Sequence, residues 1–329
     1  MADIILSIAI PTFNRCESLK EELDSLLPQL SNYKDKVEVL ISDNASPDTD
    51  CTEEMVYELD KKYGITIDYK KLPSSIYFED NFKEVVDRTH GRYVLMTGDD
   101  DLFAPNYIET LFGLIKNNYG LIHFNRLIGN DVCKETKVFD NNPSCMFYEG
   151  DTSDFIRLVM RAPGFMSSLV FRRDCWDAGK PYEKENYYGY HFLGRLYQGA
   201  VSLNTKSCYY YMPMLIERKV SHDWGTMFPL FFFVGYSNIF TDLDHSIPGI
   251  KERWLEYLHN DKPIEKYNIL IAILKDKTFY SEKKYEFYEY LTPGQKKAYN
   301  YLLCTRLPQS VVIKLYKIAL RFCCYFNIL

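Results

Sequence analysis

Short apolar runs alternate with helical patterns through the first 125 residues of this 329-residue chain. The runs are rich in β-branched residues, which is typical of strands that are covered on both faces. Between them, apolar residues recur every three or four positions, the spacing of an amphipathic helix. This alternation favours an α/β fold, with a mostly parallel sheet and helices on both faces. We predict strands over residues 4–10, 37–41, 65–69, 93–97 and 121–124, the third of them near an edge.

Polar residues follow three of these predicted strands. The carboxyl ends of parallel strands meet at one edge of a sheet, and open α/β sheets bind their ligands there. The three loops therefore indicate a binding pocket for a nucleotide or similar ligand. Their polar or turn-forming residues are Pro11, Thr12, Asn14 and Arg15 in the first loop, Asp43 and Asn44 in the second, and Asp99, Asp100 and Asp101 in the third.

The third loop consists of Gly98 followed by three consecutive aspartates, directly after an apolar run. A buried ionised carboxylate without a partner is destabilising by several kcal/mol. A divalent cation, which prefers hard oxygen ligands, would offset that penalty. The loop therefore predicts a metal-dependent site for a phosphorylated ligand. The alternative is a solvated turn in which an aspartate caps the helix that begins near Pro105.

Charge and motif content exclude several other classes of function. The formal net charge of -6 argues against nucleic acid as the main partner, because phosphate backbones require a positive field. Neither a G-x-G-x-x-G sequence nor a P-loop pattern is present. Dehydrogenases and P-loop kinases are therefore disfavoured, and phosphates would have to be held by a metal and by side chains.

The cysteines and the apolar segments bear on cellular location. Nine cysteines are scattered without metal-ligand spacing, which suits a reducing compartment better than a disulfide framework. The first residues lead almost directly into a strand, so we expect no secretory signal. No run of 18 apolar residues appears, so we expect no membrane span. These features predict a cytoplasmic protein.

Three segments, residues 7–15, 41–46 and 91–101, resemble in order and spacing the family 2 glycosyltransferases of the GT-A (Rossmann-like) fold. The resemblance covers residues 4–125 and implies an enzyme that moves a sugar from a nucleotide diphosphate sugar to an acceptor. It implies that Pro11, Thr12, Asn14 and Arg15 line the nucleotide pocket with Asn44, that Asp43 faces the base, and that Asp100 is the main Mg²⁺ or Mn²⁺ ligand.

The chain departs from the family pattern at the acidic loop. The family usually has Asp-x-Asp-Asp, and its first aspartate falls on Gly98 here. Asp99 is the candidate to take over that contact with the ribose or the metal; otherwise the contact is absent. Asp101 is a second candidate ligand beside Asp100.

The chain also departs from the family at the catalytic base. Related enzymes carry an acidic pair on a helix after a glycine-containing turn, and that pair falls on Tyr188 and Gly189 here. His191 is the nearest group with an ordinary pKa suited to base catalysis. It could equally be a buried histidine bonded to the backbone. Glu185 is the second candidate, and a retaining transfer without an enzymic base stays open.

A mixed-charge segment later in the chain offers further ligand contacts. By analogy with GT-A enzymes whose loops close over the diphosphate, Arg218 and His222 would contact phosphate and Trp224 would stack on a sugar. His222 could also complete the metal shell. A plain surface loop is the alternative.

The organisation predicted from these patterns is a glycosyltransferase domain over residues 1–225, with a nucleotide-binding half (1–125) and an acceptor half (126–225). Residues 226–329 form a helical, aromatic-rich region. Within it, residues 301–329 hold four basic residues and no acidic one, which suits a helix lying on an anionic membrane or docked on the protein core. The basic face comprises Lys314, Lys317 and Arg321, and the apolar face comprises Val311, Leu315, Ile318, Phe322 and Tyr325.

The Gly-Asp-Asp-Asp variant of the acidic loop and the aromatic second half resemble bacterial O-antigen and capsule transferases, most specifically abequosyltransferase-like enzymes that use a CDP-linked dideoxyhexose. The acceptor implied is a saccharide, lipid-linked at the cytoplasmic face of the inner membrane. Two alternatives stay open. One is a nucleotidyltransferase, although the basic glycine-rich loop of that class is absent. The other is a sugar-nucleotide or membrane-binding scaffold that has lost catalysis together with the acidic pair.

Overall fold

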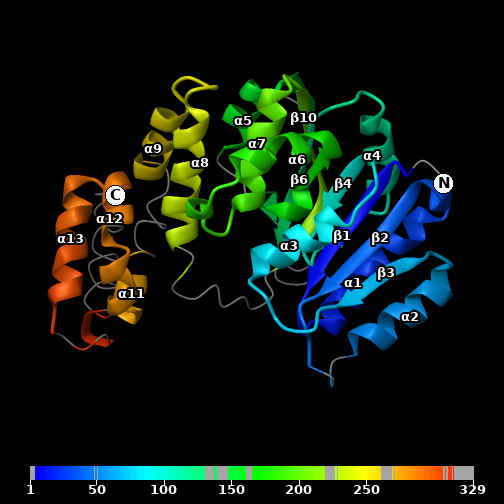
Figure 1. Ribbon diagram of the computed structural model, residues 1–329, viewed down its shortest axis with the longest axis horizontal. Helices are drawn as coiled ribbons and strands as arrows, with labels where there is room; N and C mark the ends of the chain where they lie inside the picture. The colour runs from blue at the N-terminus through cyan, green and yellow to red at the C-terminus, as the bar shows by residue number, and fades with distance from the viewer. Residues whose placement is uncertain are drawn as a thin grey trace. The chain divides into compact units, whose positions relative to one another are not determined.

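The computed structural model describes residues 4–47, 49, 51–129, 137–138, 147–160, 165–218, 227, 229–260, 269, 271–306, 308, 310–312 and 314 (Figure 1). The chain divides into two compact units. The first comprises residues 1–183 and 191–222, and the second comprises residues 184–190 and 223–329. The polar loops predicted to form the pocket belong to the first unit.

The first unit is built on one mixed sheet, which has ten strands within the described residues. Its order is β3-β2-β1-β4-β9-β6-β10-β5, with β7 beside β6 and β8 beside β10. The pairs within β3-β2-β1-β4 are parallel, whereas β9 runs antiparallel to both β4 and β6. The strands are β1 (Leu6–Thr12), β2 (Val37–Asp43), β3 (Ile67–Lys71), β4 (Tyr93–Met96), β5 (Leu102–Phe103), β6 (Leu121–Gly129), β7 (Lys137–Val138), β8 (Phe147–Asp151), β9 (Leu169–Arg172) and β10 (Lys206–Arg218).

The predicted fold class is confirmed by this arrangement, with strands close to the predicted ranges and β3 at the sheet edge. One boundary differs in a way that matters for the site. The first strand continues through Pro11 to Thr12, because its register with β2 holds to the end and pairs Thr12 with Asp43. Two of the polar loops thus start side by side.

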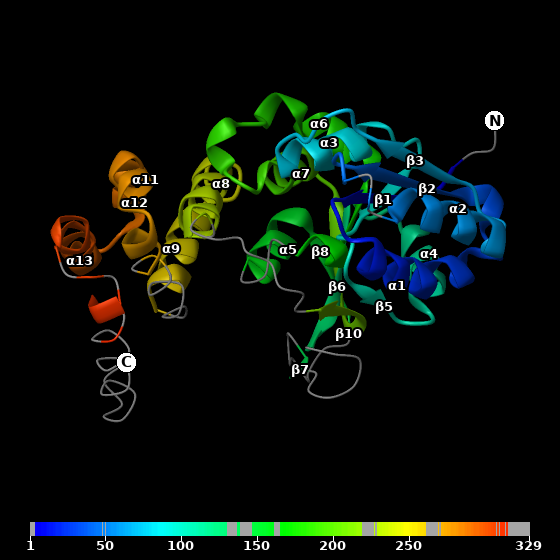
Figure 2. The same cartoon turned by 90° about the horizontal axis from the view of Figure 1, so that it is seen from below.

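Helices cover both faces of this sheet, as Figure 2 shows for α3, α6 and α7 on one face and α1 and α4 on the other. On the second face, Leu19 and Leu23 of α1 pack against a core that includes Ile8 and Leu95. Burial of this apolar stripe is the main term that holds α1 on the sheet. The helices of this unit are α1 (Cys16–Leu26), α2 (Thr52–Tyr63), α3 (Phe78–Asp87), α4 (Tyr107–Ile115), α5 (Thr152–Val159), α6 (Arg173–Gly179) and α7 (His191–Ser202).

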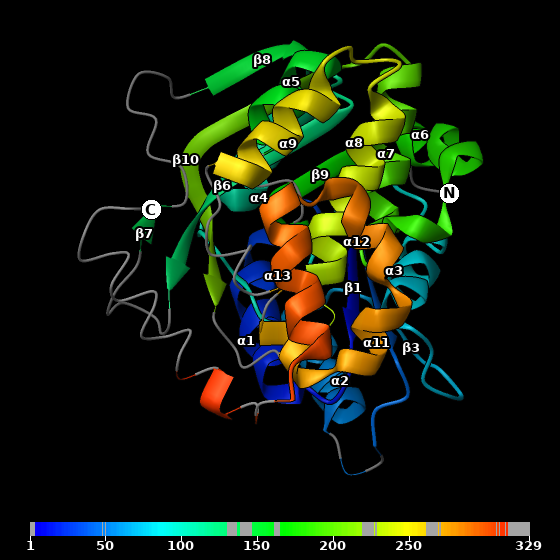
Figure 3. The same ribbon diagram turned by 90° about the vertical axis from the view of Figure 1, so that its left-hand side faces the viewer.

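The long strand β10 lies near one end of the sheet, between β6 and β5. It pairs with β6 along most of its length, with β8 over its first residues, as seen in Figure 3, and with the short β5 near its end. The β5 pairing sets Ile216 opposite Leu102, the residue that follows the acidic loop. Arg218, the last residue of β10, is thereby brought beside that loop.

The second unit is helical and rich in aromatic side chains, as predicted for the C-terminal part. Trp254 is fully buried and its ring lies 5.0 Å from that of Phe240 and 5.5 Å from that of Tyr236. Of the predicted C-terminal helix, only a few residues belong to the described part, among them Val311 and Lys314. The elements are the π-helix η6 (Leu230–Gly235), α8 (Tyr236–Leu243), α9 (Ile250–Asn260), α11 (Lys277–Glu282), α12 (Lys284–Tyr290) and α13 (Pro293–Cys304).

The structure bears on two predictions about the whole chain, one about membrane spans and one about the cysteines. None of the helices in the described ranges is both long and apolar enough to cross a bilayer. The expectation that the cysteines stay unpaired is wrong for one pair, because Cys16 and Cys51 form a disulfide. Cys16 begins α1 and Cys51 precedes α2, and these helices follow the adjacent strands β1 and β2. Neighbouring strands therefore bring the two Cα atoms to 5.6 Å, a separation that spacing along the chain does not reveal.

Candidate active site

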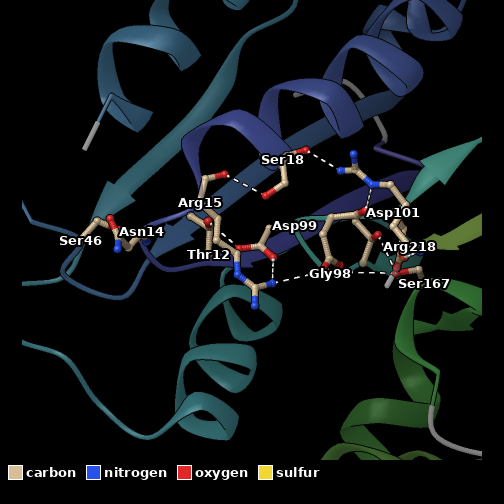
Figure 4. A network of polar contacts seen from close by, with 12 residues as sticks. Thr12, Asn14, Arg15, Ser18, Ser46, Gly98, Asp99, Asp101, Ser167 and Arg218 are labelled. Carbon is tan, nitrogen blue, oxygen red and sulfur yellow. Dashed lines mark hydrogen bonds and ion pairs between the residues drawn. The ribbon is translucent and has the colours of Figure 1, made fainter. Parts of the chain in front are cut away.

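The acidic loop after β4 meets the loop after β1 at the carboxyl edge of the sheet (Figure 4). Arg15 Nη1 lies 2.9 Å from Asp99 Oδ1 and 3.1 Å from Asp100 Oδ2. The Thr12 hydroxyl donates a hydrogen bond of 2.8 Å to Asp99 Oδ2. Residues separated by more than 80 positions in sequence are thus joined into one polar cluster, as predicted from the three loops.

The three aspartates are buried, each less than 10% exposed. Burial raises the pKa of Asp99, and the nearby Arg15 charge opposes that rise. Burial and the charge of Asp100 raise the pKa of Asp101 to about 7. Arg15 is the cation that pairs directly with the carboxylates of Asp99 and Asp100.

Asp101 and Arg218 form the far side of the cluster. Asp101 Oδ2 accepts a hydrogen bond of 2.5 Å from the Ser167 hydroxyl, and Oδ1 accepts one of 3.3 Å from the Arg218 backbone N–H. The Arg218 guanidinium donates to the Asp100 carbonyl oxygen, to Glu21 and to the Ser18 carbonyl oxygen. Arg218 therefore ties the acidic loop to α1, and Ser167, in the 3₁₀ turn Met166–Ser168 before β9, supports the loop from another side.

Gly98 occupies the position of the first aspartate in the family pattern. Its N–H donates to Ser167 Oγ at 3.0 Å, and a Cβ placed on it would lie only 3.2 Å from Asp100 Oδ1. A side chain at this position would therefore require the Asp100 carboxylate to shift slightly. Asp99, which contacts both Thr12 and Arg15, is the acidic residue at that side of the loop.

The loop after β2 is held by side chains of the predicted pocket. Asp43 accepts hydrogen bonds from the Ser46 N–H at 2.8 Å and from the Tyr69 hydroxyl at 2.6 Å. Asn44 exchanges two hydrogen bonds with the backbone of Ile76, at 2.8 and 2.9 Å. Asn14 has a positive φ of 52° and donates its N–H to Ser46 Oγ, which joins this loop to the first. The structure therefore brings the predicted nucleotide residues together.

The remaining candidate residues lie in different places. His191 begins α7 and is 27% exposed at its side chain. Its partner is Glu79 at the start of α3, which the sequence did not single out. Glu185 is exposed and belongs to the second unit. His222 and Trp224 lie outside the described residues.

Comparison of the sequence with known protein families identifies the family of this chain. The sequence model described as glycosyl transferase family 2 matches residues 7–175, more than half of the 329-residue chain. The chain belongs to glycosyl transferase family 2. The motifs had predicted this family, and membership in it disfavours the nucleotidyltransferase alternative.

One curated relative supports the finer resemblance. The family 2 chain is 28% identical over 192 residues to abequosyltransferase RfbV of Salmonella typhimurium. The match covers 53% of this chain and 55% of the relative, so it spans about half the length of each. The predicted resemblance to abequosyltransferase-like members is confirmed at this level.

Solved structures share the fold. The crystal structure of S. aureus TarS 1-349 has a TM-score of 0.60 at 13% identity, covering 90% of this chain and 91% of that one. Mannosyltransferase PcManGT from Pyrobaculum calidifontis, in complex with GDP-Man and Mn²⁺, has a TM-score of 0.53 at 14% identity, covering 95% and 87%. At such identities the likeness shows the GT-A fold alone.

The carboxylates of this family 2 chain suit a metal ion whose ligands come partly from the protein and partly from a bound phosphate group. Within the described residues, three side chains close enough to bind one ion occur at Cys16, Glu17 and Cys51, but the two cysteines already form the disulfide. The described acidic loop does not bring three such ligand atoms together. Mg²⁺ is usually bound by one or two carboxylates together with substrate phosphates. Asp100, beside Arg15, fits such a donor set.

Glu22 is a buried acid behind the acidic loop that the sequence analysis missed. It lies on α1 with no exposed surface, and neither carboxylate oxygen has a hydrogen-bond partner among the described residues. Burial raises its pKa well above the ordinary value, and the charge of Asp101 adds to the rise. A signal was present, because Glu22 follows Leu19 by three positions and precedes Leu26 by four, on the apolar face.

Replacing Glu22 with glutamine should stabilise the protein relative to wild type as the pH rises above about 4.3, the ordinary pKa of glutamate. Between the ordinary pKa and the raised pKa of the folded state, the Glu22 carboxyl is protonated in the folded protein and ionised in the unfolded chain. Unfolding in this pH window therefore releases a proton. The wild-type free energy of unfolding should fall by about 1.4 kcal/mol per pH unit from this group. Urea unfolding of both proteins across the window measures the difference. A difference that does not change with pH would contradict a protonated buried Glu22.

Proposed function

We propose that this glycosyltransferase uses a divalent metal to transfer a sugar from a nucleotide diphosphate sugar to a saccharide acceptor in bacterial surface polysaccharide synthesis. The observation that carries the proposal is the buried acidic loop, paired with Arg15 at the carboxyl edge of a family 2 fold. Carboxylates so placed, beside Arg15, suit a metal and a diphosphate.

The nucleotide side of the proposal assigns a role to each loop. Thr12, Asn14 and Arg15 border the pocket with Pro11, and Asp43 and Asn44 face the nucleoside. In this role Asp99 contacts the ribose. Asp100 holds Mn²⁺ or Mg²⁺, with Asp101 and His222 as further candidate ligands. When bound, the cation neutralises charge that develops on the departing diphosphate.

For the donor we propose a CDP-linked dideoxyhexose. The support is the 28% identity to abequosyltransferase RfbV over about half of each chain. Structural neighbours were solved with UDP-GlcNAc and with GDP-Man and Mn²⁺, so related folds accept different bases. The base therefore has to be measured for this chain.

On the acceptor side we propose His191 as the base that takes the proton from the acceptor hydroxyl, with Glu185 as the second candidate. A retaining transfer without an enzymic base would need neither. Arg218 and Trp224 are proposed to contact the phosphate and the sugar once donor is bound. Arg218 already touches the acidic loop.

We further propose that the acceptor is lipid-linked and that the protein works at the cytoplasmic face of the inner membrane. The support is the basic and apolar residues of segment 301–329, which has no acidic residue. Such a composition binds anionic lipid surfaces.

A thermal-shift experiment tests the donor and the metal together. The protein is heated with CDP, UDP, GDP or dTDP, each with and without Mn²⁺ or Mg²⁺. A nucleotide at about 100 times its dissociation constant should stabilise the fold by about 2.7 kcal/mol. We expect stabilisation by CDP that requires the metal.

The other outcomes are equally informative. Stabilisation by a different nucleotide would overturn the CDP assignment and keep the transferase site. No shift with any nucleotide would count against the proposed site and favour a scaffold, since the usual acidic pair is replaced by Tyr188 and Gly189.

A further inference from the structure

We propose that Glu79 is a positioning residue that orients His191 as the catalytic base through a carboxylate–histidine pair. The inference deepens the proposed function and rests on it. Its elements are the start of α3, the start of α7 and the loop after β2, all within the first unit.

The start of α3 is fixed to the nucleotide edge of the sheet. This helix follows β3 and runs back toward the beginning of β4, so its first turn lies at the carboxyl edge. Asn44 holds the backbone of Ile76, which precedes Phe78, the first residue of α3, by two positions. Glu79, in the first turn of α3, is therefore placed by the same loop that carries Asp43.

The two carboxylate oxygens of Glu79 have different partners on one residue. Oε1 accepts the backbone N–H of His191 at 2.9 Å, and Oε2 lies 3.5 Å from the imidazole Nδ1. The Glu79 side chain is 4% exposed, whereas that of His191 is 27% exposed. A buried acid thus anchors both the helix start and the ring of a histidine that solvent can reach.

This arrangement selects one form of the ring. A carboxylate beside Nδ1 favours the neutral tautomer with the proton on Nδ1, which leaves the lone pair on Nε2. In the transfer, Nε2 takes the proton of the acceptor hydroxyl while its oxygen bonds to the anomeric carbon. The bond from that carbon to the diphosphate oxygen breaks, and its electron pair leaves with the nucleoside diphosphate. The Glu79 carboxylate then stabilises the imidazolium that forms.

A helix-capping role alone would also explain the first of these contacts, because carboxylates satisfy N–H groups at helix starts. Glu79→Gln separates the two roles. Its amide oxygen can still accept the His191 N–H, while its NH₂ group faces Nδ1 and favours the opposite tautomer. If Glu79 only caps the helix, Glu79→Gln should change the His191 tautomer and the activity little. If Glu79 positions the ring, the variant should lose the form of His191 that is protonated at Nδ1.

The experiment uses the full chain labelled with ¹⁵N-histidine, and His191→Ala assigns the His191 signals among the six histidines. We expect the wild-type neutral ring to be protonated at Nδ1 and the Glu79→Gln ring at Nε2. In parallel, hydrolysis of a CDP-linked sugar, with water as acceptor, is measured. The kcat of Glu79→Gln should fall by about 10- to 100-fold with KM unchanged. Glu84→Gln, on the same helix but paired with Lys70, is the matched control and should hydrolyse like wild type.

A double variant completes the test. In the His191→Ala background, Glu79→Gln should lower kcat no further, because it acts through the missing ring. An unchanged tautomer in Glu79→Gln, or an equal loss in both backgrounds, would overturn the inference while leaving the proposed function intact. A wild-type protein that neither binds nor hydrolyses any nucleotide sugar would instead overturn the proposed function, and the catalytic part of this inference with it.

Discussion

Asp100→Ala should reduce glycosyl transfer by at least about 100-fold and bring nucleotide affinity in Mn²⁺ down to its metal-free value. Asp100 shares the Arg15 guanidinium with Asp99 at the carboxyl edge of the sheet. Because the described acidic loop does not supply three ligand atoms to one ion, loss of one carboxylate should remove a large share of the protein's hold on the metal. Calorimetry with nucleoside diphosphate, with and without Mn²⁺, measures the affinity.

Asp174→Ala is the matched control for this change. Asp174 is an exposed carboxylate paired with Arg172. It lies near the amino end of β4, where β9 ends, whereas the acidic loop follows the carboxyl end of β4. It should bind nucleotide and metal like wild type. Unchanged metal-dependent affinity in Asp100→Ala would refute the metal assignment.

The sequence was sufficient to predict the sheet and its polar edge because both depend on local patterns. Apolar runs such as residues 37–41 marked buried strands, and parallel topology then forced Asp43 and Asp99 to the same edge. The family motifs added roles to those positions. None of this required knowledge of which side chains touch.

Side-chain pairing could not be predicted, because it depends on contacts between distant segments. Glu79 and His191 are separated by 112 positions, and no periodicity links the start of α3 to the start of α7. The Cys16–Cys51 disulfide likewise joins residues that the fold brings together, here because their helices follow neighbouring strands. Ser167 is a further example, because it lies in the 3₁₀ turn before β9 and donates to Asp101, 66 positions earlier in the chain.

Glu22 shows the opposite case, in which a local signal existed and was passed over. Glu22 occupies a position on the helix face that is otherwise apolar, between Leu19 and Leu26. Burial there favours the neutral, protonated form of its carboxyl group. Such a violation of the local pattern is expected near a functional site. It lies directly behind the loop that carries the proposed metal ligand.

His191→Ala should lower kcat for transfer by about 10²- to 10⁴-fold, the range associated with a general base, and leave donor affinity within about twofold. The imidazole Nδ1 of His191 lies 3.5 Å from Oε2 of Glu79, a carboxylate that can support the ring. Steady-state transfer and nucleotide calorimetry on the same preparations separate kcat from binding.

Added imidazole and a second variant decide whether the ring acts as a base. Free imidazole should restore part of the activity of His191→Ala, since it supplies the missing acceptor for the proton. Glu185→Gln tests the competing carboxylate, which lies in the other unit of the chain. If Glu185→Gln loses transfer while His191→Ala keeps it, the base is Glu185. If neither change lowers kcat, transfer needs no enzymic base, and the retaining route that the missing acidic pair left open becomes the mechanism to pursue.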